Sequence, residues 1–516
     1  MLNRLVHLSQ LFFLAFFLLL FLQARYPYDS GLRSDLFLIS SPLTAITIML
    51  ASRSFIHELW PGLLILALTV PLGRFFCGWV CPLGTVIDAG DRLVRRRRSE
   101  KGGSVDTRFR SWKFFILTAV LVAALFSLQW TWLFDPIALL TRVLTIVLYP
   151  ALAFVVFAVF NAGFRLQVAE DSWYALYDSL QKHLLPVSQP RFLQSILILI
   201  LFLAILLLAF KSRRFWCRNL CPLGALLGLF SRFRLVKRNV SAACNQCAVC
   251  RRTCRMNAIE DDYSQTNTAE CIECSECAVV CKPAAVSYGV GQSRQEHYID
   301  FSRRRFVQAS VSSVAVLAVV QSAAKNRNQT GQVIRPPGSL TDEDFLDRCI
   351  RCQACVRICA STGACLQPSL TESGWEGFWS PRLEPRLGYC EYNCDLCGQV
   401  CPTGAIQKLP LPEKQKIKMG TAFFDKSRCI PWYRQEDCLV CEEHCPLPDK
   451  AIKFDIREVR AADGQVRTVK FPNVREEICT GCGICETKCP VIGKSAIFVT
   501  AAGEQRLQAR AGQEGM

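Results

Sequence analysis

The stretch RFFCGWVCPLG, residues 74–84, recurs as RFWCRNLCPLG at residues 214–224. Each copy follows a long apolar run and holds two cysteines in the spacing C-x3-C-P. Of the 516 residues, 51% are hydrophobic and 20% are charged, and most of the apolar runs lie before position 211. A motif repeated at the ends of apolar runs indicates a membrane domain that contains two copies of one unit.

The segments upstream of the two motifs also match each other. DLFLISSPLTA occupies residues 35–45, and TWLFDPIALLT occupies residues 131–141. We therefore expect two parallel copies, each with a spanning helix, an apolar segment, a second spanning helix and then the C-x3-C-P motif. The apolar segment opens with Ser41-Pro42 in the first copy and with Asp135-Pro136 in the second.

The number of membrane spans follows from the apolar runs and from the flanking charges. Eleven Lys or Arg and no acidic residue lie between Lys211 and Ile259, and a second basic cluster follows the first motif, so both motifs are expected on the cytoplasmic face. An even number of spans must then separate them, which makes the run at 143–160 re-entrant or interfacial, as its Pro150 allows. The sequence thus predicts four spanning helices, and the apolar runs lie near residues 5–22, 61–76, 112–133, 143–160 and 192–210, with a weaker run at 36–51.

The net charge of +17 raises the question of nucleic-acid binding. The basic residues gather beside apolar runs, however, and no recognised nucleic-acid-binding motif accompanies them. We therefore expect no nucleic-acid partner.

Twenty-nine cysteines dominate the chemistry of this chain. Most of them follow the spacing C-x2-C-x2-C-x3-C, which places three thiolates on one [4Fe–4S] cubane and lets the fourth cysteine reach a neighbouring cluster. Zinc also binds C-x2-C pairs, but it has no need of four consecutive cysteines repeated six times. The six quartets are Cys244, Cys247, Cys250 and Cys254; Cys271, Cys274, Cys277 and Cys281; Cys349, Cys352, Cys355 and Cys359; Cys390, Cys394, Cys397 and Cys401; Cys429, Cys438, Cys441 and Cys445; and Cys479, Cys482, Cys485 and Cys489.

The spacing also indicates how the first two quartets share their ligands. We expect Cys281 to complete the cluster of the first quartet and Cys254 to complete that of the second. The quartets that begin at Cys390 and Cys429 depart from the standard spacing, so the exchange among the four C-terminal quartets stays open. Cys365 is left over and is interpreted as a buried small hydrophobe.

The two C-x3-C-P motifs supply four more thiols, on one membrane face and close to the first ferredoxin module. These thiols could bind a metal or a cluster, relay electrons through a disulfide, or only brace helix ends. A permanent disulfide is disfavoured on the reducing side of the membrane. The candidate redox or metal residues are Cys77, Cys81, Cys217 and Cys221.

A segment inside the chain has the pattern of an export signal. SRRRFVQ at residues 302–308 precedes VSSVAVLAVVQSAA at residues 311–324, which is the arrangement of a twin-arginine signal. That route carries folded proteins, as assembled clusters require. A basic-flanked anchor helix is the alternative, and either interpretation places residues from about 325 onward outside the cytoplasm.

Taken together, these motifs resemble a fusion of two families. Residues 1–290 resemble the NapH-type membrane ferredoxins, and residues 302–500 resemble the NapG/MauM-type exported ferredoxins. The resemblance implies a quinol dehydrogenase component of the bacterial inner membrane. It would take electrons from quinol in the membrane quinone pool and pass them to a periplasmic reductase or cytochrome, after export by the twin-arginine machinery. The main alternative resembles the membrane copper reductases of cytochrome oxidase assembly, with the C-x3-C-P thiols as the metal site.

The expected fold is an α-helical membrane domain plus two α+β bacterial-ferredoxin-like domains with six [4Fe–4S] clusters in total. The first ferredoxin would be cytoplasmic and the second periplasmic. The expected domains are a membrane domain at 1–240, a two-cluster ferredoxin at 241–290, a signal or anchor helix at 300–324, a linker at 325–340, a four-cluster ferredoxin at 341–500 and a disordered tail at 501–516.

Overall fold

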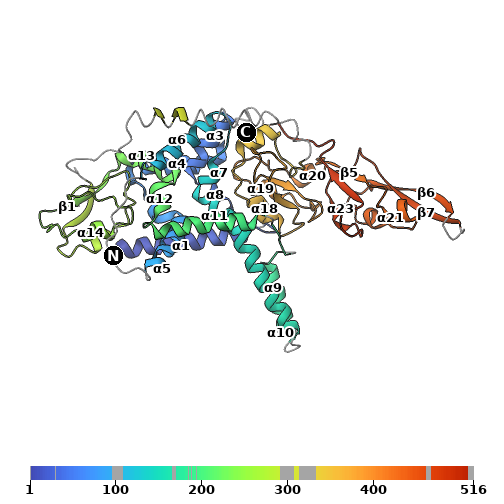
Figure 1. Cartoon of the computed structure of the whole chain (residues 1–516), viewed down its shortest axis with the longest axis horizontal. Helices are drawn as coiled ribbons and strands as arrows, with labels where there is room; N and C mark the ends of the chain where they lie inside the picture. The colour runs from blue at the N-terminus through green and yellow to red at the C-terminus, as the bar shows by residue number, and fades with distance from the viewer. Residues whose placement is uncertain are drawn as a thin grey trace. The chain divides into compact units, whose positions relative to one another are not determined.

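The computed structural model divides into two compact units (Figure 1). Unit 1 comprises Met1–Gln23, Leu32–Val147 and Ser195–Ser322, and unit 2 comprises Ala24–Gly31, Leu148–Gln194 and Ala323–Met516. The structure describes residues 2–28, 31–95, 109–165, 170–183, 185–186, 189–192, 194–290, 307–308, 310–312, 333–460 and 466–508. Most of the predicted export signal at 302–324 therefore lies outside the described residues.

Unit 1 combines apolar helices with a small ferredoxin module. The module has one antiparallel strand pair, β1 with β2, in which Val236 faces Val290. The elements are α1 (Leu2–Gln23), α2 (Leu36–Ile39), α3 (Pro42–Ser52), η1 (His57–Leu59), α4 (Trp60–Leu72), η2 (Phe76–Val80), α5 (Pro82–Arg95), α6 (Trp112–Leu125), α7 (Thr131–Phe134), α8 (Pro136–Val143), η3 (Leu144–Leu148), α11 (Ser195–Leu207), η4 (Leu208–Phe210), α12 (Phe215–Asn219), α13 (Pro222–Phe230), η5 (Ser231–Phe233), β1 (Val236–Val240), α14 (Val249–Thr253), α15 (Glu276–Val279) and β2 (Val286–Val290).

Two described helices are long and apolar enough to cross a membrane, by length and composition. They are Arg4–Gln23, with 20 residues, and Pro136–Arg165, with 30 residues. The other apolar helices are shorter than the roughly 20 residues that a span requires. These shorter helices are Pro42–Ser52, His57–Leu72, Trp112–Leu125, Ser195–Phe210 and Pro222–Phe233. The number of spans thus stays a prediction.

The helix boundaries differ from the expected runs for local reasons. The run at 112–133 ends as a helix at Leu125, because the chain turns at Ser127, whose φ is +60°. The run at 143–160 is helical, and whether it is re-entrant or interfacial stays a prediction. Pro150, the second residue of α9 (Tyr149–Arg165), lies inside the longer helix Pro136–Arg165, and α9 directly follows the π-helical turn η3.

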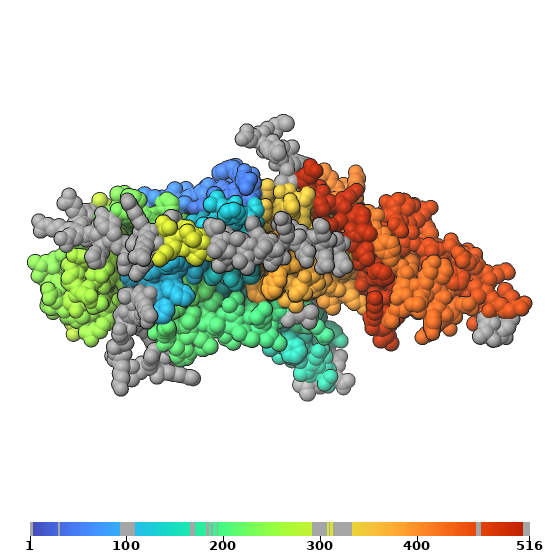
Figure 2. All heavy atoms as spheres, turned by 45° about the horizontal axis from the view of Figure 1, so that its top comes forward, coloured from blue at the N-terminus to red at the C-terminus, as the bar shows by residue number. Residues whose placement is uncertain are grey.

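Unit 2 holds short helices and three antiparallel strand pairs, β3–β4, β5–β8 and β6–β7. The longest pair, β6–β7, is labelled in the orange part of the chain in Figure 1, and Figure 2 shows the atoms of the same part as orange spheres. Besides α9, its elements are α10 (Glu170–His183), α17 (Asp342–Arg348), α18 (Ala354–Cys359), β3 (Leu366–Pro368), β4 (Pro381–Leu383), α19 (Leu396–Gln399), α20 (Leu411–Lys414), β5 (Thr421–Phe424), α21 (Ile430–Arg434), α22 (Val440–Glu443), β6 (Ile452–Arg460), β7 (Val466–Val474), α23 (Ile484–Lys488) and β8 (Ile497–Thr500).

Two expected boundaries of the second ferredoxin domain need correction. Residues 333–340 were expected to be linker, yet Val333 and Leu340 are buried in unit 2. Residues 501–508 were expected to be a disordered tail, yet the backbone of Leu507 bonds to Ser339 and Thr341. The two ends of the domain close on each other through these backbone hydrogen bonds, which a composition argument does not reveal.

Candidate iron–sulfur centres

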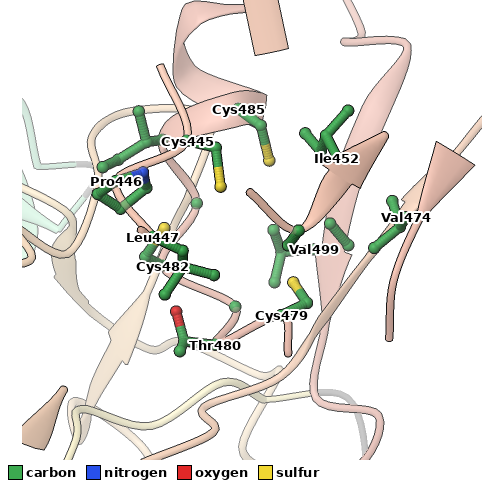
Figure 3. A pocket seen from close by; sticks show the side chains of 15 residues that line it. Cys445, Pro446, Leu447, Ile452, Val474, Cys479, Thr480, Cys482, Cys485 and Val499 are labelled. Carbon is green, nitrogen blue, oxygen red and sulfur yellow. The ribbon is translucent and has the colours of Figure 1, made fainter. Parts of the chain in front are cut away.

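Four cavities in unit 2 are each lined by four or five cysteines. Three of the thiols in each cavity come from one quartet, and the fourth comes from a partner quartet. Figure 3 shows one cavity, into which Cys479, Cys482 and Cys485 project together with Cys445. The other cavities hold Cys429, Cys438, Cys441 and Cys489; Cys349, Cys352, Cys355 and Cys401; and Cys390, Cys394, Cys397 and Cys359, with Cys365 beside them. The structure thereby assigns the ligand exchange that the sequence left open: the third quartet pairs with the fourth, and the fifth with the sixth.

The standard quartets form their loops by a shared backbone device. In each of them, the residues on either side of the second cysteine have positive φ, as Arg351 and Gln353 do around Cys352. Gly481 and Gly483 flank Cys482 in the same way, and only there does glycine adopt this conformation freely. A short helix then starts before the third cysteine. Successive turns of this kind aim backbone N–H groups into a concavity that suits an anion such as a thiolate-ligated cluster.

The two quartets with longer spacing lack this device. The residues before the corresponding short helices, Asp395 and Leu439, have φ of −124° and −110°. The extra residues in these loops let the chain bring its three cysteines to one cavity, which the other quartets do with left-handed residues.

In the first ferredoxin module of unit 1, the surroundings of Cys254 support its expected crossing to the second quartet, and the crossing of Cys281 stays a prediction. Cys254 lies within electrostatic range of Cys271 and Cys274. Cys281 packs against the cluster of buried residues that includes Cys250 and Cys277. This placement fits two neighbouring cubanes that each borrow one cysteine from the other quartet.

Burial couples the ionisation of the quartet thiols to metal binding. Burial raises the pKa of Cys441 to about 12 and that of Cys482 to about 12. Protonated thiols do not bind iron, so cluster insertion must release protons, and the positive charge of the iron replaces them. Apolar residues such as Ile452 and Val499 line the cavity around Cys482 and keep it shielded from water.

The spacing of the thiols fits a cluster better than a single ion. Tetrahedral zinc with Zn–S bonds of about 2.3 Å requires thiolates that nearly touch. Among the described residues, which include all 29 cysteines, no three Cys, His, Asp or Glu side chains are close enough to share one metal ion. The cysteines nevertheless surround common cavities, as a larger cubane requires.

The left-over Cys365 lies closer to the site than its interpretation as a plain hydrophobe implied. Its Sγ is 3.7 Å from the Sγ of Cys359, and both residues line the cavity of Cys390, Cys394 and Cys397. This cavity therefore has five thiols for four iron positions. The sequence carries one signal for this irregularity: Ala360 follows Cys359, whereas a proline follows Cys401, Cys445 and Cys489.

The structure also brings the four C-x3-C-P thiols together. Cys77 and Cys217 pack against Met256 and Ile272, and these two residues also contact cysteines of the first ferredoxin module. The C-x3-C-P motifs and the first ferredoxin module therefore pack against the same group of buried residues within unit 1.

Buried ion pairs connect the loop of the first ferredoxin module to Arg74 of the first C-x3-C-P motif and to Lys113 of α6. Both Arg74 Nη1 and Lys113 Nζ bond to the carboxylate of Glu270, at 3.1 Å and 2.5 Å. All three side chains are almost fully buried, and Glu270 immediately precedes Cys271. Sequence reasoning did not single out Glu270, because nothing in its local pattern shows that two distant cations converge on it.

A second ion network surrounds Asp88 on α5. Its carboxylate accepts hydrogen bonds from Arg214 at 2.7 Å and from Arg255 at 2.6 Å. Burial opposes ionisation of Asp88, but Arg214 and then Arg255 outweigh it and lower its pKa to about 2. Arg255 follows Cys254 directly, so this network also sets the position of a cluster ligand.

These features define a class of protein, a multi-centre ferredoxin-type protein that binds [4Fe–4S] clusters for electron transfer. A family model described as a 4Fe-4S binding domain matches residues 59–100, 194–241 and 397–418. The chain belongs to the family of ferredoxin-type proteins MauM and NapG. It is 34% identical over 191 residues to the methylamine utilization ferredoxin-type protein MauM of Methylorubrum extorquens, which is 37% of this chain and 80% of that protein.

Other relatives support the same assignment. The ferredoxin-type protein NapG of Escherichia coli is 32% identical over 203 residues, which is 38% of this chain and 84% of NapG. The methylamine utilization ferredoxin-type protein MauN of Paracoccus denitrificans is 30% identical over 187 residues, which is 35% of this chain and 48% of MauN. No solved structure matches this chain.

Proposed function

We propose that this protein oxidises membrane quinol and passes the electrons through six [4Fe–4S] clusters to a redox partner in the periplasm. Its relationship to MauM and NapG and its match to a 4Fe-4S binding domain support electron transfer. The clusters, when bound, supply one-electron transfer at low potential. The finer parts of the proposal, quinol as donor and a periplasmic acceptor, rest on the arrangement of this chain's own residues.

The observation that carries the proposal is the contact between the membrane motifs and the ferredoxin module. Cys77 and Cys217 pack on the same three residues, Met256, Ala258 and Ile272, as the cluster cysteines Cys254, Cys271 and Cys274. Electrons that arrive at the membrane motifs would therefore have a short route into the first ferredoxin. A soluble ferredoxin that only diffuses between partners has no use for such a rigid junction.

The apolar surface of unit 1 supports contact with the lipid that holds quinol. Leu8, Leu11 and Phe12 on α1 are each more than 60% exposed. Contiguous exposed apolar side chains of this kind mark a membrane or partner surface. In the proposal, α1 lies in the bilayer and the basic residues that follow the C-x3-C-P motifs lie at its cytoplasmic face.

The proposal assigns the two ferredoxin modules to opposite sides of the bacterial inner membrane. The arginines at 303–305 would direct the C-terminal module into the twin-arginine route. There the four cavities of unit 2 would hold the clusters that deliver electrons to the acceptor. Those cavities are lined by the cysteines of the third to sixth quartets.

A reduction experiment tests the donor. The full chain is placed in lipid vesicles under anaerobic conditions, a reduced quinol analogue is added, and the clusters are followed by EPR. We expect signals of reduced clusters to grow with quinol concentration. Dithionite serves as the control, because it reduces clusters without a quinol site. Clusters that dithionite reduces and that quinol never reduces would remove quinol oxidation from the proposal.

A further inference from the structure

We infer that the two C-x3-C-P motifs together hold one additional [4Fe–4S] cluster, ligated by Cys77, Cys81, Cys217 and Cys221. This inference rests on the proposed role in iron–sulfur electron transfer and adds a seventh centre to the six quartets. It also answers why the motif is duplicated, because each copy supplies only half of a ligand set.

The four thiols share one location in unit 1. Cys81 lies within electrostatic range of Cys77 and Cys217. Cys221 lies within electrostatic range of the other three thiols. Each motif contributes one cysteine from a short helical segment and one from the cap of the following helix. The arrangement thus has the two-plus-two symmetry of the sequence repeat.

The arginine at the start of each motif copy packs against the other copy. A Cβ added to Gly84 would lie 3.5 Å from Nη2 of Arg214 and 3.3 Å from the carbonyl oxygen of Cys77. A Cβ added to Gly224 would lie 2.7 Å from Nη2 of Arg74 and 3.4 Å from the carbonyl oxygen of Cys217. The arginine that opens each motif therefore packs against the glycine that closes the other motif. This explains why the repeated frame extends from arginine to glycine and not only over the cysteines.

Helix N-termini place a backbone amide on the sulfur at two of the four positions. Cys221 caps α13, and its Sγ accepts a hydrogen bond from the backbone N–H of Gly224 at 3.4 Å. Cys81 immediately precedes α5 in the matching position and is bonded by the N–H of Gly84. Amide hydrogen bonds to cysteine sulfur stabilise a ligated cluster and tune its potential.

A buried cation points at the same place. Arg74 is fully buried, and its Nε and Nη2 have no hydrogen-bond partner, although Nη1 is bound to Ala269 and Glu270. The guanidinium interacts electrostatically with Cys77 and Cys221. A cubane with four thiolate ligands carries net negative charge, so a buried guanidinium beside Cys77 and Cys221 would stabilise it, in addition to pairing with Glu270.

The geometry disfavours a single ion that needs three or more ligands, and the family comparison favours a cluster. As in the ferredoxin quartets, no three of these side chains come close enough to share one ion in the described part of the chain. The 4Fe-4S family model also matches residues 59–100 and 194–241, which contain both motifs. Neither segment contains a ferredoxin quartet, so the match itself falls on the C-x3-C-P cysteines.

Iron counting in the full chain tests the inference. The anaerobically purified wild-type protein should contain about 28 iron and 28 sulfide, against about 24 for six clusters alone. The double variants Cys77→Ser/Cys217→Ser and Cys81→Ser/Cys221→Ser should each lose about four iron. The quadruple variant should lose no more than either double variant, because all four thiols serve one centre. Thr69→Ala is the control, since Thr69 is a buried residue of α4 that carries no thiol and bonds to the carbonyl of Ile65 in its own helix, so the iron content should stay unchanged.

Three results would overturn the inference. The first is a wild-type content of about 24 iron that stays unchanged in both double variants. The second is stoichiometric copper in the wild type that both double variants lose. The third is a disulfide between these cysteines, detected after denaturation in an alkylating agent. The iron content of the wild-type protein tests the inference even if the variants fail to accumulate. If this count is about 24 and quinol still reduces the clusters, the inference fails and the proposed function survives. If the count is far below 24, the six-cluster proposal itself fails.

Discussion

The hydroxyl of Ser41 donates a hydrogen bond to Oδ2 of Asp135 over 2.5 Å. Both residues are fully buried, and each precedes the proline that begins a short helix, α3 after Ser41 and α8 after Asp135. The two sequence copies therefore meet at their corresponding positions, N-cap against N-cap. Asp135 also accepts from the amides of Ile137 and Ala138 at 3.0 Å and 2.9 Å, so one carboxylate joins two helix starts.

Removing the Asp135 carboxylate should destabilise unit 1 more than removing the Ser41 hydroxyl. Asp135→Ala leaves two buried amides and the Ser41 hydroxyl without an acceptor, at about 1–3 kcal/mol for each unsatisfied group. Ser41→Ala should cost about 1 kcal/mol, as the loss of an N-cap does. Thermal unfolding in detergent measures both, and Asp135→Asn, which retains one oxygen, should fall between them. Equal midpoints for wild type and Asp135→Ala would show that this junction carries no stability.

Asp88→Asn should lower the stability of the junction between α5 and the first ferredoxin. The change leaves the buried guanidinium of Arg214 without its carboxylate, at about 3–5 kcal/mol. Asp91→Asn is the matched control on the same helix, because Asp91 accepts only the backbone amide of Arg214. Thermal unfolding midpoints in detergent compare the two variants, and a larger loss for Asp91→Asn would contradict this account.

The ion pair of Asp88 with Arg214 also predicts how stability depends on pH. The folded pKa of Asp88 is lowered to about 2 from 3.8, so its contribution is complete above the higher value and is lost as pH falls through the lower one. The difference in midpoint between wild type and Asp88→Asn should therefore stay constant between about pH 5 and pH 8. A difference that shrinks as the pH falls within this range would mean that Asp88 is not held ionised by the two arginines.

The ligand exchange predicts which double variants lose one cluster and which lose two. Cys445 shares its cavity with Cys482, so Cys445→Ser, Cys482→Ser and their combination should each lose about four iron. Cys441 belongs to the neighbouring cavity, so Cys445→Ser combined with Cys441→Ser should lose about eight. Iron and sulfide analysis of anaerobic protein measures these losses. The opposite pattern would mean that each quartet binds its own cluster.

Cys365 should act as a reserve ligand for the cluster of Cys390, Cys394 and Cys397. Because its Sγ lies 3.7 Å from that of Cys359, Cys359→Ser should retain most of the iron through Cys365. The double variant Cys359→Ser/Cys365→Ser should lose about four iron, whereas Cys365→Ser alone should lose none. An equal loss from Cys359→Ser and from the double variant would show that Cys365 cannot replace Cys359.

Export should depend on the arginines at 303–305. A reporter fused after residue 290 should be cytoplasmic, and one fused after residue 340 should be periplasmic. Replacing Arg303, Arg304 and Arg305 by Lys should keep the second reporter inside, because the twin-arginine receptor reads the guanidinium pair. Position is checked by protease protection in spheroplasts. Unchanged export of the triple variant would support the anchor-helix alternative.

The sequence alone predicted much of the cluster chemistry. Regular cysteine spacing is a local property, since residues two or three apart in a tight loop must face one centre, and this sufficed to predict the crossing of Cys254 and Cys281. It did not suffice for Cys359, Cys401, Cys445 and Cys489. Their partners are set by which loops fold together, and residues 333–340 and 501–508 proved to be part of that fold.

The sequence determined that the motif at residues 74–84 is duplicated, that its cysteines lie beside basic segments, and that six quartets follow. It did so because apolar runs, charge clusters and short cysteine spacings act within one or two turns of chain. Only the tertiary structure showed that Arg74 reaches Gly224, that Arg214 reaches Gly84, and that Glu270 is buried between two cations. Those relationships join segments more than a hundred residues apart. They depend on close packing and on the pairing of buried charges, which no local pattern encodes.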